Sequence, residues 1–188
     1  IITNIGEAHI ENFKNIKGIA KAKAEIIDNI QENGTIILNR DDNFFNYLNK
    51  RAKLKKLRVV TFSKRKKSDI SLIRAINRKN FTKLFLQVEN KKVDLEIKNI
   101  NIYNVLASLA VIKVLKLDLN KIKKIFKYFE PTEGRGKIHI ISRYNKKFKL
   151  IDESYNANPL SVKNAIHSFD EIQKKQFKKY LILGDMLE

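Results

Sequence analysis

The sequence predicts an α/β protein in which a mostly parallel sheet carries a small antiparallel part. In residues 1–63, apolar strand-like runs alternate with segments of helical period, which is typical of strands joined by crossover helices. Between Asp69 and Ile97 the pattern changes to short apolar or alternating runs separated by polar turns, which favours antiparallel hairpins. A second α/β unit is expected after the segment "EPTEGRGK" (Glu130–Lys137), which contains Pro and two Gly residues.

Local signals place each element before that segment. Ile1–Ile5 has the composition of a buried strand end, and Lys17–Gln31 has the period of a helix that ends before Gly34. Asn101–Lys116 is apolar on nearly all sides, so this helix is expected to be buried. The other expected elements, in chain order, are a strand at 35–39, a helix at 41–54, a strand at 57–63, antiparallel strands at 69–76, 81–88 and 92–97, and a helix at 119–128.

The boundary segment divides the chain into two expected domains, residues 1–131 and residues 132–188. The second domain is expected to contain strands at 137–142, 148–154 and 178–185 and a helix at 159–172. Because the sequence begins inside one strand-like run and stops just after another, we expect it to be part of a longer protein.

Composition excludes several classes of protein. Of the 188 residues, 43% are hydrophobic, which is enough to bury a sizeable core. No apolar run approaches the roughly 20 residues of a membrane-spanning helix, so no membrane insertion is expected. The absence of Cys excludes disulfides and thiolate metal sites, and it fits a reducing, cytoplasmic environment.

The formal net charge of +19 is compatible with nucleic acid, an acidic membrane surface or phosphorylated substrates as partners. Most of the lysines are scattered and lack the interleaved aromatic residues of a base-stacking surface. Lys, Ile and Asn are enriched together, which indicates a compositional bias. We therefore expect no nucleic-acid partner, and a basic nucleic-acid-binding module remains the alternative from a different functional class.

One lysine and one histidine stand out as possible functional residues. Lys23 falls on the apolar stripe of the first helix, where burial would disfavour the ammonium and leave a nucleophile, a ligand anchor or an amine that captures CO2 as a carbamate. The alternative is a lysine at the edge of the stripe whose amine reaches water. His9, taken alone, is more often a structural residue than a metal ligand. Asp41 and Asp42 could reach a metal, but Asp42 is better explained as a helix N-cap.

Two further segments carry polar groups that could bind a ligand. Asn101, Asn104 and Ser108 lie on one face of the apolar helix, and an Asn amide both donates to and accepts from the paired edge of adenine. A polar strip that meets solvent is the alternative. The segment "LIDESYNANPLS" (150–161) follows a strand and opens a helix at Asn158 and Pro159, a place where phosphates bind. A well-capped loop that binds nothing is the alternative there.

Seven segments spread over the whole chain together resemble the Mur ligase family, the ATP-dependent amide-forming enzymes of peptidoglycan precursor assembly. They are "ITNIGEAHIENF", "IAKAKAEI", "LNRDD", "NIYNVLASLA", "EGRGKI", "DESYNANP" and "LILGDMLE". The combination of "SYNANP" with "GDMLE" is similar to the branch of the family that adds D-Ala-D-Ala. The resemblance implies that residues 1–131 are the later part of a central ATP-binding domain and that residues 132–188 begin a Rossmann-like C-terminal domain.

The resemblance also implies roles for individual residues. By this resemblance His9 is a magnesium ligand, and Lys23 is carried as a carbamate that helps to hold a second magnesium ion. The residues expected at ATP by the same resemblance are Asn101, Asn104, Arg135, Glu153, Tyr155, Asn156 and Asn158.

The implied reaction has two stages and requires ATP and Mg²⁺. The γ-phosphoryl group moves to the terminal carboxylate of UDP-MurNAc-tripeptide, and the amine of D-Ala-D-Ala then displaces phosphate from the acyl phosphate. The sequence contains no GxxGK[ST] phosphate loop, which the family carries upstream of the matching segments, so the 188 residues alone are expected to lack ligase activity. Another Mur ligase or a folylpolyglutamate synthase is the alternative within this class, and a monomer is expected.

Overall fold

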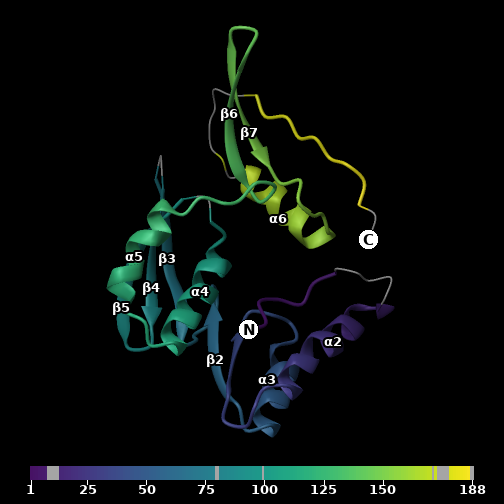
Figure 1. The fold of residues 1–188 in the computed structure, drawn as a ribbon, viewed down its shortest axis with the longest axis vertical. Coiled ribbons are helices and arrows are strands. Elements are labelled where there is room, and N and C mark those ends of the chain that lie inside the picture. Colours follow the sequence, from purple (N-terminus) through teal and green to yellow (C-terminus); the bar gives the residue numbers. More distant parts are fainter. Residues whose placement is uncertain (8–12, 79–80, 99, 171, 173–177, 187–188) are drawn as a thin grey trace. The chain divides into compact units, whose positions relative to one another are not determined.

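The computed structural model describes residues 1–7, 13–78, 81–98, 100–170, 172 and 178–186 (Figure 1). These residues form two compact units. The first consists of Ile1–Ile5 and Ala20–Glu130, and the second of Gly6–Ile19 and Pro131–Glu188. The chain therefore leaves the first unit after Ile5 and returns to it at Ala20.

The first unit is built on a five-stranded sheet in the order β1-β2-β3-β4-β5. The strands are β1 (Thr35–Asn39), β2 (Arg58–Ser63), β3 (Ile70–Asn77), β4 (Thr82–Val88) and β5 (Lys91–Ile97). β1, β2 and β3 run parallel, whereas β3, β4 and β5 form antiparallel pairs. Ile2 adds an isolated parallel bridge to Leu38 beside β1. The predicted combination of parallel strands with an antiparallel excursion between 69 and 97 is confirmed.

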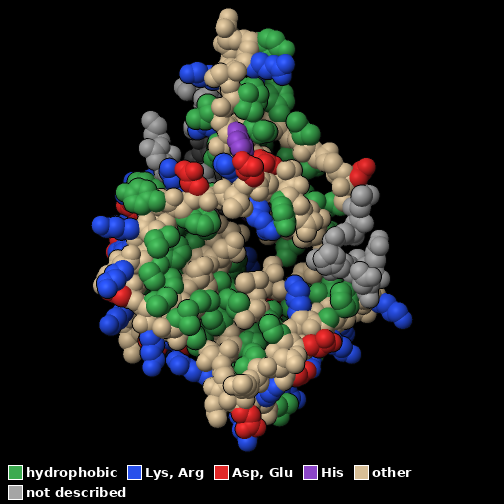
Figure 2. Space-filling model, in the orientation of Figure 1, with side chains coloured by type: hydrophobic (Ala, Val, Ile, Leu, Met, Phe, Trp, Pro, Cys, Tyr) green, Lys and Arg blue, Asp and Glu red, His purple; other side chains and the backbone are tan. Residues whose placement is uncertain are grey.

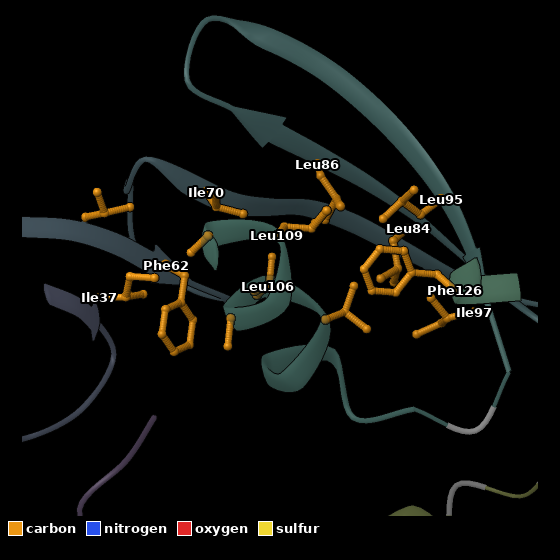
Figure 3. Close-up of a cluster of buried hydrophobic side chains, with 14 residues drawn as sticks. Ile37, Phe62, Ile70, Leu84, Leu86, Leu95, Ile97, Leu106, Leu109 and Phe126 are labelled. Carbon is orange, nitrogen blue, oxygen red and sulfur yellow. The ribbon is translucent and has the colours of Figure 1, made fainter. Parts of the chain in front are cut away.

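Helices of the first unit include α3 (Phe45–Leu54), α4 (Ile102–Val114), α5 (Leu119–Tyr128) and, from Ala20 onward, α2 (Ile16–Asp28). α4 packs on β1, β2 and β3, and α5 packs on β5. The core lies between these helices and the sheet, where Phe62, Leu106 and Leu109 meet apolar side chains of β3, β4 and β5 (Figure 3). The nearly all-apolar α4 is buried as predicted, because it covers three strands at once. Figure 2 shows Lys and Arg side chains scattered over the visible face of this unit and interspersed with Asp and Glu.

The second unit contains a two-stranded antiparallel sheet, β6 (Lys137–Arg143) and β7 (Lys146–Asp152), and the helix α6 (Pro159–Asp170). Tyr144 and Asn145 between the strands both have positive φ, the conformation that joins two strands through a two-residue turn. Asn158 and Ser161 cap α6 reciprocally, since Asn158 Oδ1 accepts from the Ser161 N–H at 2.9 Å and Ser161 Oγ accepts from the Asn158 N–H at 3.0 Å. The predicted helix start at Pro159 is confirmed.

The strand predicted at 178–185 is wrong. Residues 178–186 have no regular secondary structure, and Tyr180 and Ile182 are 77% and 91% exposed. A strand forms only where a neighbouring backbone supplies hydrogen-bond partners, and β6 and β7 pair only with each other within the described residues. The apolar run alone therefore does not produce a strand. Among the described residues, no helix is long and apolar enough to span a membrane.

Candidate active site

The carboxyl end of β1 holds the first residues of the chain in place. Asn39, at the end of β1 and only 9% exposed, donates from Nδ2 to the Thr3 carbonyl at 3.0 Å. Asp42 accepts from the Ile5 N–H through Oδ2 at 2.7 Å. Two side chains that lie more than thirty residues further along the sequence thus fix residues 3–5 from either side of Asn4. In parallel α/β sheets this strand edge is where ligands bind.

Asp42 is not the N-cap that the sequence suggests. Helix α3 begins at Phe45, and its N-cap is Phe44, whose side chain makes no capping bond. Asp42 stands two residues earlier, where Oδ1 accepts from the Phe44 N–H at 2.7 Å. Its second carboxylate oxygen accepts from the Ile5 N–H, so both oxygens of Asp42 bond to backbone N–H groups outside the helix.

Lys23 is exposed, so its place inside the buried stripe of α2 is wrong, and the alternative of a lysine at the edge of the stripe whose amine reaches water is confirmed. The buried positions of this helix are Ile19, Ala20, Ala24 and Ile27, and the stripe therefore passes through Ala24. Lys23 lies one residue, or about 100°, away from it, and its ammonium stays accessible to water. The Nζ atom donates to the Asn4 carbonyl at 3.2 Å. The Lys23 amine is thus hydrogen-bonded to the same short segment, residues 3–5, that Asn39 and Asp42 hold.

Asp41 joins the loops that follow β1 and β2 to helix α4. Its Oδ2 accepts from the backbone N–H groups of Lys64 and Arg65, at 2.6 and 3.0 Å, and from the Tyr103 hydroxyl at 3.2 Å. Its Oδ1 is buried and has no hydrogen-bond partner among the described residues. Burial, and next the Asp41 carboxylate, raise the pKa of the Tyr103 hydroxyl above its ordinary value. Tyr103 therefore donates to Asp41 throughout the neutral range.

The start of α4 presents two amide side chains to solvent. Asn101 is the N-cap, and its Oδ1 accepts from the Tyr103 N–H at 2.8 Å. Asn104 lies one turn later and is exposed, as is Ser108 after another turn. Capping occupies the Asn101 oxygen, whereas the Asn104 side chain is exposed to solvent. The predicted polar face exists, and Asn104 is its better candidate for reading a base.

In the second unit, a turn at Thr132–Gly136 is bound to the end of β7. Asp152 makes the connection, because its Oδ2 accepts from the Gly134 N–H at 2.9 Å and its carbonyl accepts from the Gly136 N–H at 2.7 Å. The Tyr155 N–H donates a hydrogen bond to the Gly134 carbonyl at 3.1 Å. Gly134 has φ +72°, and a Cβ there would lie 2.9 Å from the Tyr155 nitrogen. The turn therefore requires glycine at this position.

This turn brings three of the predicted residues together. The Arg135 guanidinium lies 4.1 Å from the centre of the Tyr155 ring, a cation–π arrangement that orients the guanidinium. Glu153 Oε1 lies 3.1 Å from the position that a Cβ on Gly136 would occupy. Partial burial, and next the neighbouring Asp152, raise the pKa of the Glu153 carboxyl. An arginine, an aromatic ring and a carboxylate side by side are suited to the ribose and phosphates of a nucleotide.

Asp152 was not among the residues predicted from the sequence, although its hydrogen bonds hold the Thr132–Gly136 turn against β7. Its position at the end of a strand, facing a turn with two glycines, was the available signal.

Asn158 is engaged in capping α6, and Asn156 is exposed beside it. His9 lies outside the described residues. Within the described residues no group of three or more His, Asp or Glu side chains could hold a metal ion.

The fold and these two polar sites define a class of protein. Residues 1–112 match the model of the Mur ligase middle domain, and the chain belongs to the Mur ligase family. Over its whole length it is 30% identical to the UDP-N-acetylmuramoyl-tripeptide–D-alanyl-D-alanine ligase of Buchnera aphidicola subsp. Acyrthosiphon pisum, of which it covers 41%.

Solved structures show the same fold. The crystal structure of MurF from Acinetobacter baumannii matches 91% of this chain with a TM-score of 0.78 and 24% identity, over 37% of that protein. The structure of MurF ligase from Thermotoga maritima in complex with ADP matches 88% of this chain with a TM-score of 0.72 and 22% identity, again over 37% of its length. The chain thus spans about two fifths of the proteins that it resembles.

Proposed function

We propose that this chain is part of a cytoplasmic, ATP-dependent ligase that joins D-Ala-D-Ala to UDP-MurNAc-tripeptide with release of ADP and phosphate. The observation that carries the proposal is the 30% identity, over the whole chain, to the UDP-N-acetylmuramoyl-tripeptide–D-alanyl-D-alanine ligase of Buchnera aphidicola. In this proposal residues 1–131 are the later part of the ATP-binding domain, and residues 132–188 begin the C-terminal domain. The activity belongs to the longer protein, because the chain covers 41% of the relative.

Each unit carries its own candidate groups for contact with a nucleotide. Asn104, and Asn101 through its free amide nitrogen, would contact adenine from the start of α4. Arg135, oriented by the Tyr155 ring, would contact the ribose or phosphates, and Glu153 would accept a hydrogen bond from a ribose hydroxyl. Asn156 and Asn158 would complete the loop around the nucleotide. The exposure of Asn104 and the stacked guanidinium of Arg135 fit such a ligand.

Lys23 fits a metal site only after modification. An ammonium is a hydrogen-bond donor and carries a positive charge, so it repels Mg²⁺. A carbamate on the same nitrogen presents anionic oxygen ligands, the type that Mg²⁺ prefers. The exposed Nζ is accessible to dissolved CO2, which fits this modification. We propose Lys23, as a carbamate, and His9 as ligands of Mg²⁺, which when bound neutralises the charge of the transferring phosphoryl group.

The reaction is tested with the full-length protein by measuring ADP release in the presence of UDP-MurNAc-tripeptide and different amine substrates. ADP release is expected with D-Ala-D-Ala and not with single amino acids. Turnover with a single amino acid would instead indicate another Mur ligase, and turnover with a folate and glutamate would indicate a folylpolyglutamate synthase. The 188-residue chain alone is expected to be inactive in every case.

A salt-dependent gel shift with DNA tests the alternative of a basic binding module. We expect only weak binding that 200 mM salt abolishes, because the basic side chains on the visible face of the first unit are interspersed with acidic ones (Figure 2). Tight binding that survives this salt concentration, together with no binding of ATP by the full-length protein, would favour the nucleic-acid alternative.

A further inference from the structure

We propose that Asn39 and Asp42 are positioning residues for Lys23, and that they act through the backbone carbonyl of Asn4. The inference deepens the proposed function and rests on it, because it gives the carbamate at Lys23 a defined orientation. It is based on three contacts of the first unit that converge on residues 3–5.

Residues 2–5 are held to the carboxyl end of β1 and the turn after it by several hydrogen bonds. The Ile2 N–H donates to the Ile37 carbonyl at 3.0 Å, which ties the segment to β1. The Asn39 amide and the Asp42 carboxylate then fix the peptide groups before and after Asn4, at 3.0 and 2.7 Å. A bond from a backbone N–H to a carboxylate is charge-assisted and stronger than a neutral one. The Asn4 carbonyl therefore has little freedom to move.

The Asn4 carbonyl is a hydrogen-bond acceptor for the Lys23 side chain. Nζ lies 3.2 Å from the Asn4 oxygen. An exposed lysine otherwise samples many rotamers, and the bond restricts this long side chain to those that reach the strand end. The held segment and the lysine are thus coupled, since displacing residues 3–5 also displaces the acceptor of the amine.

Carbamate formation changes the number of N–H donors on the lysine nitrogen. The neutral amine attacks the carbon of CO2, a C–N bond forms, one C=O electron pair moves to oxygen, and nitrogen releases one proton to water. An ammonium has three N–H donors, whereas the carbamate nitrogen keeps one. The single Asn4 carbonyl matches that one donor, and this bond would set the direction in which the carbamate oxygens point. Because Mg²⁺ binds carbamate oxygens and not an ammonium, this fixed direction would raise carbamate occupancy when Mg²⁺ is present, and Asn39 and Asp42 would contribute to it without touching the carbamate.

The experiment measures carbamate occupancy in the full-length protein by 13C NMR at increasing concentrations of 13C-bicarbonate, with Mg²⁺ present. Lys23→Ala identifies the carbamate signal. Asp42→Asn keeps an oxygen for the Phe44 N–H but places an NH2 group against the Ile5 N–H. It therefore removes the contact that holds Ile5 and leaves the contact of Asn39 with Thr3. Asp28→Asn is the matched control. Asp28 is an exposed carboxylate that pairs with Arg51, and it lies on α2, the helix that carries Lys23.

Asp42→Asn is expected to raise the half-saturating bicarbonate concentration about fivefold, the effect of one hydrogen bond, while Asp28→Asn leaves it unchanged. Excess bicarbonate should restore the ligase rate of Asp42→Asn, which a general structural defect would not allow. An unchanged half-saturation point in Asp42→Asn overturns the positioning role and leaves the proposed function intact. A wild-type protein without any carbamate signal removes the modified lysine from the proposed function, and the positioning role with it.

A measurement on the wild-type protein covers the case in which Asp42→Asn does not fold. Coupling is reciprocal, so saturating bicarbonate should slow hydrogen exchange of the Ile5 amide by the same factor of about five. Lys23→Ala should show no such slowing. Equal exchange with and without bicarbonate in a protein that carries the carbamate would contradict the coupling.

Discussion

The Oδ2 atom of Asp152 accepts a hydrogen bond from the backbone N–H of Gly134, 2.9 Å away. The other carboxylate oxygen accepts from the Ser154 N–H at 3.1 Å. One side chain at the end of β7 thus fixes the turn that carries Arg135 and the first residue of the loop that carries Tyr155. The geometry of the candidate nucleotide site in this unit depends on a residue that is not expected to touch the nucleotide.

Asp152 should titrate at unusually low pH. Hydrogen bonds from Ser154, and next from the Gly134 N–H, hold the pKa of Asp152 below its ordinary value. Its stabilising effect is therefore complete above the unfolded-state pKa of about 3.9 and is lost as the pH falls through the lower folded-state pKa. The chemical shift of the Gly134 amide should report a midpoint below about 3.9. Asp152→Asn should abolish this titration, and a midpoint at or above the ordinary value would contradict the assignment.

Gly134→Ala should destabilise the second unit. The residue has φ +72°, and an added Cβ would lie 2.7 Å from the Tyr155 Cβ. The left-handed conformation alone costs about 1–2 kcal/mol for alanine, and the contact adds to this cost. Gly184→Ala is the matched control, because no atom of the described residues, apart from Gly184 and its two chain neighbours, lies within 4 Å of its Cβ position. Hydrogen exchange of the β6 and β7 amides should accelerate only in Gly134→Ala, and equal rates in both variants would show that the turn tolerates a side chain.

Variants at Asn101 should separate capping from nucleotide binding. Asn101→Ala removes the bond to the Tyr103 N–H and should lower the free energy of unfolding by about 1 kcal/mol. Asn101→Asp retains the capping oxygen, so stability should be close to that of the wild type. Asn104→Ala should leave stability within about 0.5 kcal/mol, because the side chain is exposed.

Urea unfolding of the 188-residue chain measures these stabilities, and ADP titration of the full-length protein measures affinity. If Asn104 contacts adenine, Asn104→Ala should weaken ADP binding about tenfold without loss of stability. Unchanged ADP affinity in both Asn104→Ala and Asn101→Asp would place adenine elsewhere.

Asp69 should make the first unit sensitive to acid. Burial raises the pKa of its carboxyl, but hydrogen bonds from the Thr61 hydroxyl and N–H outweigh this effect and, with the Lys113 ammonium, leave the pKa below its ordinary value. The contribution of Asp69 is thus present above the unfolded-state pKa and lost as the pH falls through the folded one. Asp69→Asn should cost about 1 kcal/mol at pH 7.

This difference between Asp69→Asn and the wild type should shrink progressively below about pH 4. Urea unfolding at several pH values is the measurement. Lys83→Ala is a useful comparison, since Lys83 pairs with the half-exposed Asp94 and such surface pairs contribute little. A difference that is constant from pH 7 to pH 2.5 would show that the carboxylate charge is unimportant.

Elements with a strong local pattern could be predicted from the sequence. Helix α5 was predicted at 119–128 and has those bounds, because Asp118 caps it and its apolar positions follow the helical period. The three antiparallel strands were recognised because their polar turns interrupt alternating runs. The local pattern thus predicted where helices and strands lie. It also predicted that α4 is buried, because a helix that is apolar on all sides is stable only when other elements pack around it.

Features that depend on distant partners could not be predicted. Whether Lys23 or Ala24 faces the core is decided by which side of α2 packs on the rest of the unit, and the period alone leaves a choice between neighbouring positions. Asp42 was predicted to be a helix cap from its local position. The sequence does not reveal its hydrogen bond to Ile5, because the two residues are 37 positions apart. Asp152 was overlooked because its neighbour Glu153 matched the family pattern, while the contacts of Asp152 become visible only when the turn folds back on β7.

The exposed run Tyr180–Leu183 has a practical consequence for work with the isolated chain. Four uncharged residues of high β-propensity, exposed by 77%, 52%, 91% and 61%, form a segment that tends to add to the strand edges of other molecules. Lys178 and Lys179 on one side and Asp185 on the other act as charged gatekeepers that oppose such association. Low salt should therefore keep the purified chain dispersed at high concentration, whereas salt that screens these charges should promote its aggregation.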